Sequence, residues 1–466
     1  MAMKQVSPAD GLAAKIYGRG KPDPDRCYRK SLFAVDVPCD DGVIFFHTLA
    51  GSMFLLNEVD AEQLSEALLR ELPLRELEHT VSAECFRTVT ELIKERYLVP
   101  DDTDEIKHAS EVRSMMELMM LQKEKKVKNA FTILTTTDCN ARCFYCYEMG
   151  RSRITMSEKT AADVALYIIN ACGGEKVSLN WFGGEPLKNK PAIDIITGKL
   201  RERDIEFSSS ITTNGYYLDR ETVRKCKDAW NVKRIQITLD GTEKTYNRIK
   251  AYREADPNPY ETVLGNMEEA LKAGLGIGIR LNMDAKNAGD LNDLVDELTR
   301  RFSGFENVKI YAALLREFAG SIHEFSGEDK AAEQCLQLQR KIDEAGLGSS
   351  AGLKRAVRLN RCMADSDSAE VILPDGQIGK CEHISESDFI GTIYDPARDS
   401  ALIRAWKERR EPYPECRTCP LFPRCIILKK CAWTEDKCRH SKRILRLTRL
   451  KKEILQAYTE KRADAE

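Results

Sequence analysis

The sequence predicts an α/β protein with a parallel sheet at its centre, because strand-like and helix-like segments alternate from residue 129 to residue 315. The strand-like segments are AFTILTT, KVSLNWF, IEFSSSITT, VKRIQITL, GIGIRLNM and NVKIYAAL. Helical periodicity lies between them, near 157–172, 190–203, 219–229, 260–274 and 289–302. Six such units are too few for an eight-stranded barrel, so a partial (β/α)6 barrel with a TIM-like plan is expected within residues 129–345.

A smaller α+β unit is predicted for residues 28–100. SLFAVDVP alternates like a strand, and GVIFFHTLAGSMFLLN is typical of a hairpin that turns near Ala50 and Gly51. One helix is expected after Asn57 as its N-cap, and a second from about Ser82 to Arg96. This order suits a winged helix-turn-helix. The second helix has mixed charges and no basic face, which argues against nucleic-acid binding.

Three further regions complete the chain. Residues 101–128 predict a charged helical linker whose Met-rich patch, SMMELMML, packs between domains. Residues 355–440 are rich in cysteine and poor in periodic elements, which favours a segment held together by metal. Residues 441–466 predict a basic amphipathic helix that packs on the preceding domain, with Ile444, Leu447 and Ile454 on one stripe.

Composition and charge bear on location and partners. The net charge is −2, so no global field favours nucleic acid or an acidic membrane. The N-terminus lacks an apolar signal-like core, and no run of apolar residues is long enough to span a bilayer. A cytoplasmic protein with no nucleic-acid and no membrane partner is therefore expected.

Cysteine is the most informative residue type, with sixteen in the chain. Six are scattered, Cys335 among them, and indicate small buried hydrophobes. Cys139, Cys143 and Cys146 directly follow the first predicted strand. A zinc site completed from elsewhere is the alternative, but C-x3-C-x2-C is not a zinc spacing and no His lies nearby. Three thiolates could instead hold three irons of a cubane and leave the fourth iron for a ligand that is not protein.

The next four predicted strands each end in a short motif. These motifs are GGEP at 183–186, TTNG at 212–215, LDG at 239–241 and RLNMD at 280–284. Each one alone is ordinary turn chemistry. Because ligand sites lie at the carboxyl ends of parallel strands, the motifs and the cysteine loop are expected to meet at one edge of the sheet.

The cysteine motif, with the aromatic Tyr145 before its last cysteine, and the GGEP segment resemble those of radical S-adenosylmethionine (radical SAM) enzymes across the barrel region. The resemblance implies a [4Fe–4S] cluster whose open iron binds S-adenosyl-L-methionine, and a 5′-deoxyadenosyl radical made after an electron donor such as flavodoxin or ferredoxin reduces the cluster. It implies that the GGEP motif meets the SAM amino group. Residues of the later strands would then contact SAM or line the substrate cavity. The residues given these roles are Tyr145, Gly183, Gly184, Glu185, Pro186, Ser209, Asn214, Asp240 and Arg280.

Seven further cysteines follow the pattern C362-x13-G376-x4-C381, then C416-x2-C419-x5-C425-x5-C431-x6-C438. A zinc ribbon is the alternative, but seven cysteines do not divide into tetrads, and the absence of His from the set favours iron–sulfur. His383 and His440 lie nearby and are taken as surface residues or as neighbours of ligands.

This pattern resembles the SPASM domain, except that five residues rather than the usual three separate its fifth and sixth cysteines. The resemblance implies two auxiliary [4Fe–4S] clusters, an outer one on Cys416, Cys419, Cys425 and Cys438, and an inner one on Cys362, Cys381 and Cys431. Three clusters then have ten cysteines, which leaves one iron open for SAM and one open on the inner cluster.

The winged unit resembles the RiPP recognition element, which binds the leader of a ribosomally synthesised precursor peptide. The leader would add as a strand along residues 51–57, beside the helix near 82–96. The prediction is a radical SAM maturase of a precursor peptide that forms Cys thioether crosslinks, similar to ranthipeptide and sactipeptide enzymes, because an open auxiliary iron could bind a substrate thiolate. The alternatives are a carbon–carbon crosslinking maturase, oxidation of one Cys or Ser as by an anaerobic sulfatase maturase, and a zinc-binding adaptor.

Overall fold

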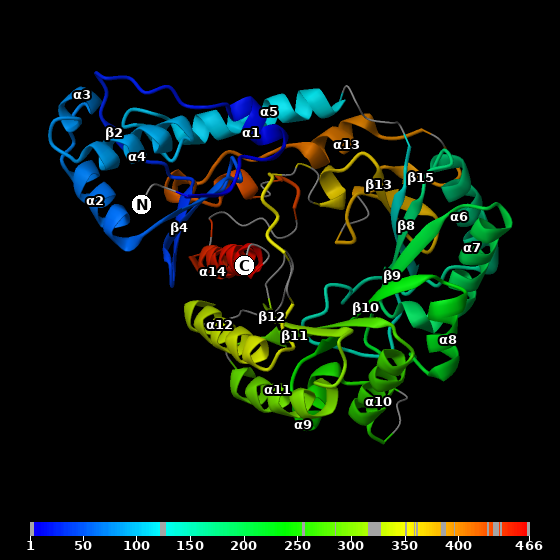
Figure 1. The fold of residues 1–466 in the computed structure, drawn as a ribbon. Helices are drawn as coiled ribbons and strands as arrows, with labels where there is room; N and C mark the ends of the chain where they lie inside the picture. Colours follow the sequence, from blue (N-terminus) through cyan, green and yellow to red (C-terminus); the bar gives the residue numbers. More distant parts are fainter. Residues whose placement is uncertain are drawn as a thin grey trace.

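The computed structural model describes residues 4–121, 127–253, 257–284, 286–315, 328–349, 352–357, 359, 362–383, 388–395, 397–425, 428–431, 438 and 440–463. Its main element is a nine-stranded sheet with strand order β12-β11-β10-β9-β8-β7-β13-β14-β15 (Figure 1). Six strands pair in parallel in chain order: β7 (Ala130–Thr136), β8 (Val177–Gly183), β9 (Phe207–Thr213), β10 (Val232–Leu239), β11 (Gly276–Met283) and β12 (Val308–Leu314). These are the predicted strands, and the parallel sheet is confirmed. Predicted positions at 122–126 of the linker, 316–327 of the barrel region and 464–466 lie outside the described residues.

Helices connect the parallel strands and cover one face of the sheet (Figure 1). They are α6 (Glu158–Ala171), α7 (Lys190–Glu202), α8 (Arg220–Asp228), α9 (Glu243–Lys250), α10 (Pro259–Lys272) and α11 (Ala288–Phe302), and α12 (Glu328–Glu344) follows the last strand. Side-chain caps fix several starts: Ser157 accepts a hydrogen bond from Thr160 N, and Asp219 accepts one from Thr222 N. Helix α9 was not predicted, and it matters for the site.

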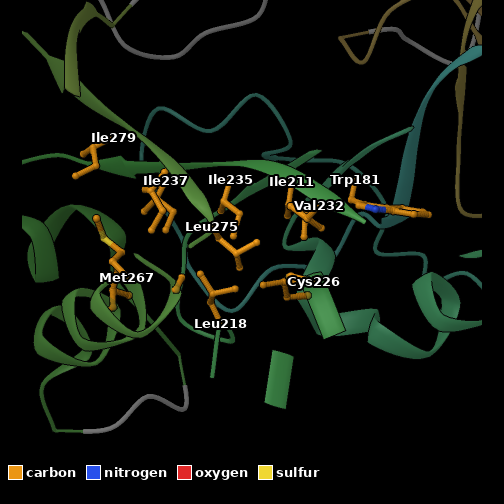
Figure 2. Packing of buried hydrophobic residues seen from close by; sticks show 14 of the residues in the cluster. Trp181, Ile211, Leu218, Cys226, Val232, Ile235, Ile237, Met267, Leu275 and Ile279 are labelled. Atoms are coloured by element: carbon orange, nitrogen blue, oxygen red, sulfur yellow. The ribbon is translucent and has the colours of Figure 1, made fainter. Parts of the chain in front are cut away.

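The two faces of the sheet differ because side chains alternate along each strand. On the helix side, Figure 2 shows Trp181, Ile211 and Ile235 facing side chains of the helical layer such as Cys226. The other face is polar, and its residues bond to one another across strands. Ser210 Oγ donates to Asn180 Oδ1 at 3.0 Å, and Tyr311 OH donates to Gln236 Oε1 at 2.8 Å. The sheet therefore separates an apolar core from a polar inner surface.

The cysteine-rich C-terminal region continues this sheet. Strand β13 (Ala369–Ile372) pairs in parallel with β7, and β14 (Gln377–Gly379) and β15 (Gly391–Thr392) add to it in antiparallel fashion. Gly376 has φ +86° in the turn before β14, where a side chain would crowd Ile393 and Tyr394 at 3.0 Å. The glycine thus permits the turn that delivers Cys381. Sequence patterns did not predict these strands.

The N-terminal unit contains the predicted hairpin and helices. Strands β3 (Ala34–Cys39), β4 (Gly42–His47) and β5 (Met53–Leu56) pair in antiparallel order, followed by α2 (Glu58–Leu69), α3 (Leu74–Leu77) and α4 (Ala83–Lys94). Asn57 caps α2 by accepting from Asp60 N, and Ser82 caps α4 by accepting from Cys85 N. Strands β2 (Tyr28–Lys30) and β6 (Leu98–Pro100) form a separate small sheet that was not predicted.

One finding corrects the predicted leader site. Strand β1 (Lys4–Ser7) pairs in antiparallel fashion with β5, with Lys4 opposite Leu55 and Gln5 opposite Phe54. The edge of residues 51–57, expected to receive a leader strand, therefore carries a strand of the same chain. The adjoining α1 (Gly11–Tyr17) packs on α5 (Glu105–Leu121).

The linker helix and the C-terminal helix both join distant parts of the chain. In α5, Met116 is buried with Cys416 and Phe422, as expected of packing between regions, whereas Met115 is 52% exposed. Helix α14 (His440–Ala463) packs Leu450 and Ile454 against the N-terminal sheet. The same cluster includes Cys419 and Leu421, so the expected packing on the preceding domain is present together with an unpredicted contact with the N-terminal sheet. Among the helices of the described residues, none has the length and apolarity to cross a membrane.

Candidate functional site

Cys139, Cys143 and Cys146 lie in the loop that follows β7. Cys146 N donates to Cys143 O at 3.1 Å, which forms a tight turn, and Cys139 N donates to Asp138 Oδ1 at 2.9 Å. Ala141 N donates to Cys139 Sγ at 3.3 Å, the kind of contact that tunes iron–sulfur sites. The loop thus presents three sulfurs from one short segment at the carboxyl edge of the sheet.

The chemistry of these thiols fits a metal cluster. Burial, followed by the charges of Glu185 and the other two thiolates, raises the pKa of Cys139 to about 12. Burial likewise raises the pKa of Cys143 to about 11. Buried thiolates that repel one another need a cationic partner, which a cluster of irons provides. Within the described residues, no three His, Cys, Asp or Glu side chains form a group that could hold a single metal ion.

Gly183 and Gly184 let the end of β8 lie directly against the start of the cysteine loop. Gly184 N donates to Thr136 O at 2.9 Å. A Cβ on Gly183 would collide with the carbonyl oxygen of Thr136, and a Cβ on Gly184 with those of Thr137 and Asp138. Both glycines are therefore required by backbone contact with the residues just before Cys139.

Glu185 is 1% exposed, and its carboxylate joins three segments. It accepts hydrogen bonds from Leu187 N at 3.0 Å, Thr213 Oγ1 at 2.7 Å and Asn214 N at 2.8 Å. Its own N–H donates to Asp138 O at 3.0 Å. Burial raises the pKa of Glu185. In this structure the carboxylate organises the strand ends, and its contact with the SAM amino group stays a prediction. Pro186 begins a short 3-10 helix, Pro186–Asn189.

The structure places the two predicted residues of β9 and its end, Ser209 and Asn214, in different surroundings. Asn214 Nδ2 donates to Asn140 Oδ1 at 2.8 Å and lies 3.8 Å from Cys139 Sγ, so it contacts the cysteine loop. Ser209 Oγ instead donates to the carbonyl oxygen of Trp230 at 2.6 Å, on the helix side of the sheet. The expectation that Ser209 lines the cavity or contacts SAM is therefore corrected. Alternation along the strand places its neighbour Ser210 on the inner face.

Tyr145 and Asp240 form the centre of a buried polar network. Tyr145 OH donates to Asp240 Oδ1 at 2.7 Å, and Asn282 Nδ2 donates to both groups at 3.0 and 3.1 Å. Asp240 is fully buried, and it also meets Lys250 Nζ at 3.0 Å. The cysteine loop, LDG and RLNMD thus meet as predicted. Sequence patterns missed Lys250, because it ends the unpredicted helix α9 and belongs to no motif.

Charges link the remaining cysteines into two groups. Burial, followed by the charges of Glu382, Cys362 and Cys431, raises the pKa of Cys381. Burial and then the charges of Cys425, Cys419 and Cys438 raise the pKa of Cys416 to about 11. These are the sets of three and four that were predicted as ligand groups, and their binding of clusters stays a prediction.

Side chains outside the motifs support both groups. His383 N donates to Cys381 Sγ at 3.4 Å in the inner group. In the outer group, Arg446 Nη1 of α14 donates to Cys425 Sγ at 3.4 Å, and Arg113 Nη2 of α5 donates to the carbonyl oxygens of Pro423 and Cys425 at 2.8 and 3.1 Å. These arginines come from helices far from the cysteines in sequence, so spacing alone did not reveal them.

The inner group lies beside the barrel loop. The ring of Tyr147, next to Cys146, is 4.2 Å from the ring of His383 and 6.3 Å from that of Phe182, centroid to centroid. Arg151 Nη1 also donates to Glu382 O at 3.3 Å. The side chain of His383 is 14% exposed, and burial lowers its pKa, so it is not the surface residue allowed by the sequence. The charge of Glu382 raises that pKa, and the charges of Arg151 and Arg280 lower it; the role predicted for Arg280 at the SAM site stays a prediction.

The comparisons with known proteins agree with this geometry. A family model described as the Radical SAM superfamily matches residues 133–298. Those residues form a radical SAM domain. The protein is a radical SAM superfamily enzyme, and its use of S-adenosylmethionine and iron–sulfur chemistry was correctly predicted.

Curated relatives match the domain over part of their length. The GTP 3′,8-cyclase of Nautilia profundicola is 28% identical over 210 residues, which are 42% of this chain and 63% of the relative. The Fe-coproporphyrin III synthase of Methanosarcina barkeri is 24% identical over 238 residues, which are 49% of this chain and 55% of the relative. The chain thus spans less than two thirds of each of these relatives.

Solved structures share the fold. anSMEcpe with AdoMet and the Cp18Cys peptide bound has a TM-score of 0.54 at 15% identity, covering 72% of this chain and 98% of that one. SuiB of Streptococcus suis bound to S-adenosylmethionine has a TM-score of 0.50 at 15% identity, covering 87% of this chain and 94% of that one. These likenesses establish the α/β radical SAM fold.

Proposed function

We propose that this enzyme uses three [4Fe–4S] clusters and S-adenosylmethionine to form a thioether crosslink in a ribosomally synthesised precursor peptide. The observation that carries the proposal is that the predicted cysteines act on one another's charge in three sets, while His383, two residues after Cys381, contacts Tyr147 of the barrel loop. When bound, the clusters and SAM supply the electron and the hydrogen-abstracting radical. The chain supplies the ligands, their positions and an enclosed polar chamber.

Cys362, Cys381 and Cys431 favour a thioether over other crosslinks. A cubane has four irons, so three cysteines leave one coordination position for a substrate thiolate. Cys335, the scattered cysteine nearest to this set in sequence, is 3% exposed within the hydrophobic core of the barrel, in the same cluster as Leu338 and Ile342. That placement keeps the fourth position available for substrate sulfur.

Residues of the chain position the reacting groups. Glu185 and Asn214 hold the strand ends against Asn140 and the cysteine loop. The inner face of the sheet adds hydrogen-bonding groups such as Ser210 and Gln236 that could orient a peptide backbone. Precise orientation matters, because an abstracted hydrogen must lie next to the site where the radical forms.

A peptide substrate is also supported by the fold. SuiB was solved bound to its precursor peptide SuiA, and the match with that structure covers 85% of this chain. The N-terminal unit has the strand and helix order that resembles a leader-binding element. Since β1 occupies the β5 edge, we propose that the leader takes its place. Strand β1 exposes Lys4 and Gln5, so its displacement uncovers little apolar surface.

A nucleotide-cyclising activity is the second candidate, because the matched relatives include GTP 3′,8-cyclases. The match covers 42% of this chain and 63% of that relative. This candidate predicts a small-molecule substrate and no leader dependence.

The deciding experiment uses the full chain, purified and reconstituted without oxygen. Iron and sulfide analysis should give about twelve of each per chain, four for each cubane. The reduced enzyme is then given SAM with either the short Cys-containing peptide encoded beside its gene or GTP. Release of 5′-deoxyadenosine and loss of about two hydrogen masses per crosslink from the peptide support the proposal. Cys143→Ala is the control without a barrel cluster. Tightly bound zinc in place of iron, or turnover of GTP but not of the peptide, would reject the proposed function.

A further inference from the structure

Residues 250–253 lie directly against the cysteine loop, although they are about a hundred positions away in sequence. Arg142 N donates to Lys250 O at 2.7 Å, and Arg253 N donates to Asn140 O at 2.8 Å. Between these two contacts Ala251 adopts a left-handed conformation, with φ 44° and ψ 55°. A non-glycine residue there costs free energy, so surrounding contacts must hold the segment in place.

The side chain of Lys250 occupies the space beneath the loop. Its Nζ lies 3.0 Å from Asp240 Oδ2, 2.7 Å from Thr238 Oγ1 and 3.3 Å from Tyr145 OH. The exposed fractions of the Lys250 and Asp240 side chains are 2% and 0%. A buried ion pair of this kind contributes little net stability compared with apolar packing, so its retention calls for another explanation.

The charges around Lys250 offer an explanation for the buried ion pair. Burial opposes a charge on Lys250, but the Asp240 carboxylate raises its pKa well above the usual value, which keeps the ammonium charged. The ammonium lies 3.3 Å from the hydroxyl of Tyr145, which stands between Cys143 and Cys146 in the loop. The positive charge therefore lies beside the segment that carries two of the predicted cluster ligands.

We propose that Lys250 is a positioning residue of the radical SAM site that fastens the cysteine loop through Tyr145 and Asp240 and places a fixed positive charge beneath the cluster. The reduced cluster carries one more negative charge than the oxidised one. A buried cation close to its ligands therefore favours reduction, because the low dielectric of the interior strengthens the attraction. Cluster potentials respond to local charge in this way.

The test measures the reduction potential of the cluster in the full chain. Lys250→Gln removes the charge and keeps a hydrogen-bond donor, and Lys250→Arg keeps the charge. Lys188→Gln is the matched control, because Lys188 pairs with Asp138 in the same loop but is 39% exposed, where water screens its charge. Iron content, thermal unfolding and EPR-monitored titration are recorded for each variant, and the barrel cluster is identified as the signal that changes when SAM is added.

We expect Lys250→Gln to make reduction at least tenfold less favourable, about 59 mV for one electron, with a smaller shift for Lys188→Gln and near wild-type behaviour for Lys250→Arg. Loss of barrel-cluster iron in Lys250→Gln but not in Lys250→Arg also supports the proposal. A fully loaded Lys250→Gln whose potential matches that of Lys188→Gln overturns it. Equal iron loss in both Lys250 variants overturns the proposal as well, since the shape of the side chain and not its charge would then explain its effect on the cluster.

Discussion

The ring of Tyr147 meets the ring of His383 almost edge-on, with centroids 4.2 Å apart and planes inclined at 69°. Tyr147 follows the last cysteine of the barrel loop, and His383 lies two residues after Cys381 of the inner group. The contact therefore joins the site of radical formation to the site proposed for substrate sulfur. Each site restricts the other's position through these two side chains.

Replacing Tyr147 should uncouple the two sites. Tyr147→Ala removes the ring contacts with both His383 and Phe182, whereas Tyr147→Phe keeps them. We expect Tyr147→Ala to lower crosslinked peptide at least tenfold while 5′-deoxyadenosine still forms, because the radical then lies out of register with its target. Chromatography of both products gives the ratio. A parallel loss of both products in Tyr147→Ala would show that the ring serves the barrel cluster alone.

Gly184→Ala should damage the barrel cluster. Its Cβ would collide with the backbone carbonyls of Thr137 and Asp138, and backbone cannot yield as a side chain can. We expect loss of about four irons per chain, one cubane, in the reconstituted protein. Gly198→Ala is the matched control, because that helical glycine has no atom within 4 Å of its added Cβ. The control should keep its iron and gain about 0.5–1 kcal/mol in free energy of unfolding. Full iron in Gly184→Ala would contradict the close approach.

Cys431→Ala tests the membership of the inner group. The departure from the SPASM spacing falls just before this residue, yet its charge acts on both Cys362 and Cys381. We expect the variant to lose about four irons per chain while retaining SAM cleavage at the barrel cluster. Cys335→Ala should keep all its iron, because Cys335 lies in the apolar core. Iron loss from Cys335→Ala comparable to that of Cys431→Ala would revise the ligand set.

Removal of residues 2–8 should expose the edge of β5. If the leader takes the place of β1, the truncated enzyme binds a fluorescent leader peptide more tightly, by about tenfold or more, because no competing strand must be displaced. Fluorescence anisotropy measures the affinity. Lys461→Met removes the hydrogen bonds from Lys461 Nζ to Val6 O at 2.9 Å and to Ser7 Oγ at 2.5 Å but keeps β1 itself, so it should give a smaller gain. Weaker binding after truncation would instead mean that the leader adds to β1 itself.

His47 should make the fold sensitive to acid. It is fully buried in the N-terminal unit, its Nδ1 accepts from Ala50 N at 3.1 Å, and burial lowers its pKa from 6.5 to about 3. The unfolded chain therefore binds a proton that the folded chain does not. The free energy of unfolding therefore keeps its full value above pH 6.5. It decreases as the pH falls from 6.5 toward 3, by up to about 1.4 kcal/mol per pH unit. Denaturant unfolding across this range should show a flatter pH dependence in His47→Gln.

Local patterns sufficed for much of the fold. The apolar strands that end in GGEP or LDG, the cap Asn57 and the helix start near Ser82 are encoded within a few residues, and they appear as predicted. Contacts made by residues outside any motif could not be foreseen. Lys250 reaches Tyr145 from the end of α9, and β1 pairs with β5 from almost fifty positions away. The prediction for Ser209 was wrong for a different reason. Which face of the sheet its side chain occupies depends on the exact register of its strand.

The packing of α14 on the N-terminal sheet has a consequence for how the protein is made. Val35, Ile44 and Phe46 emerge early from the ribosome, but the side chains of Leu450 and Ile454 that cover them come more than four hundred positions later. At about 5–20 residues per second, synthesis of that stretch takes tens of seconds. Throughout that time the early sheet presents an uncovered apolar face. Its assembly therefore waits until α14 has been synthesised, and the growing chain is a candidate for chaperone protection.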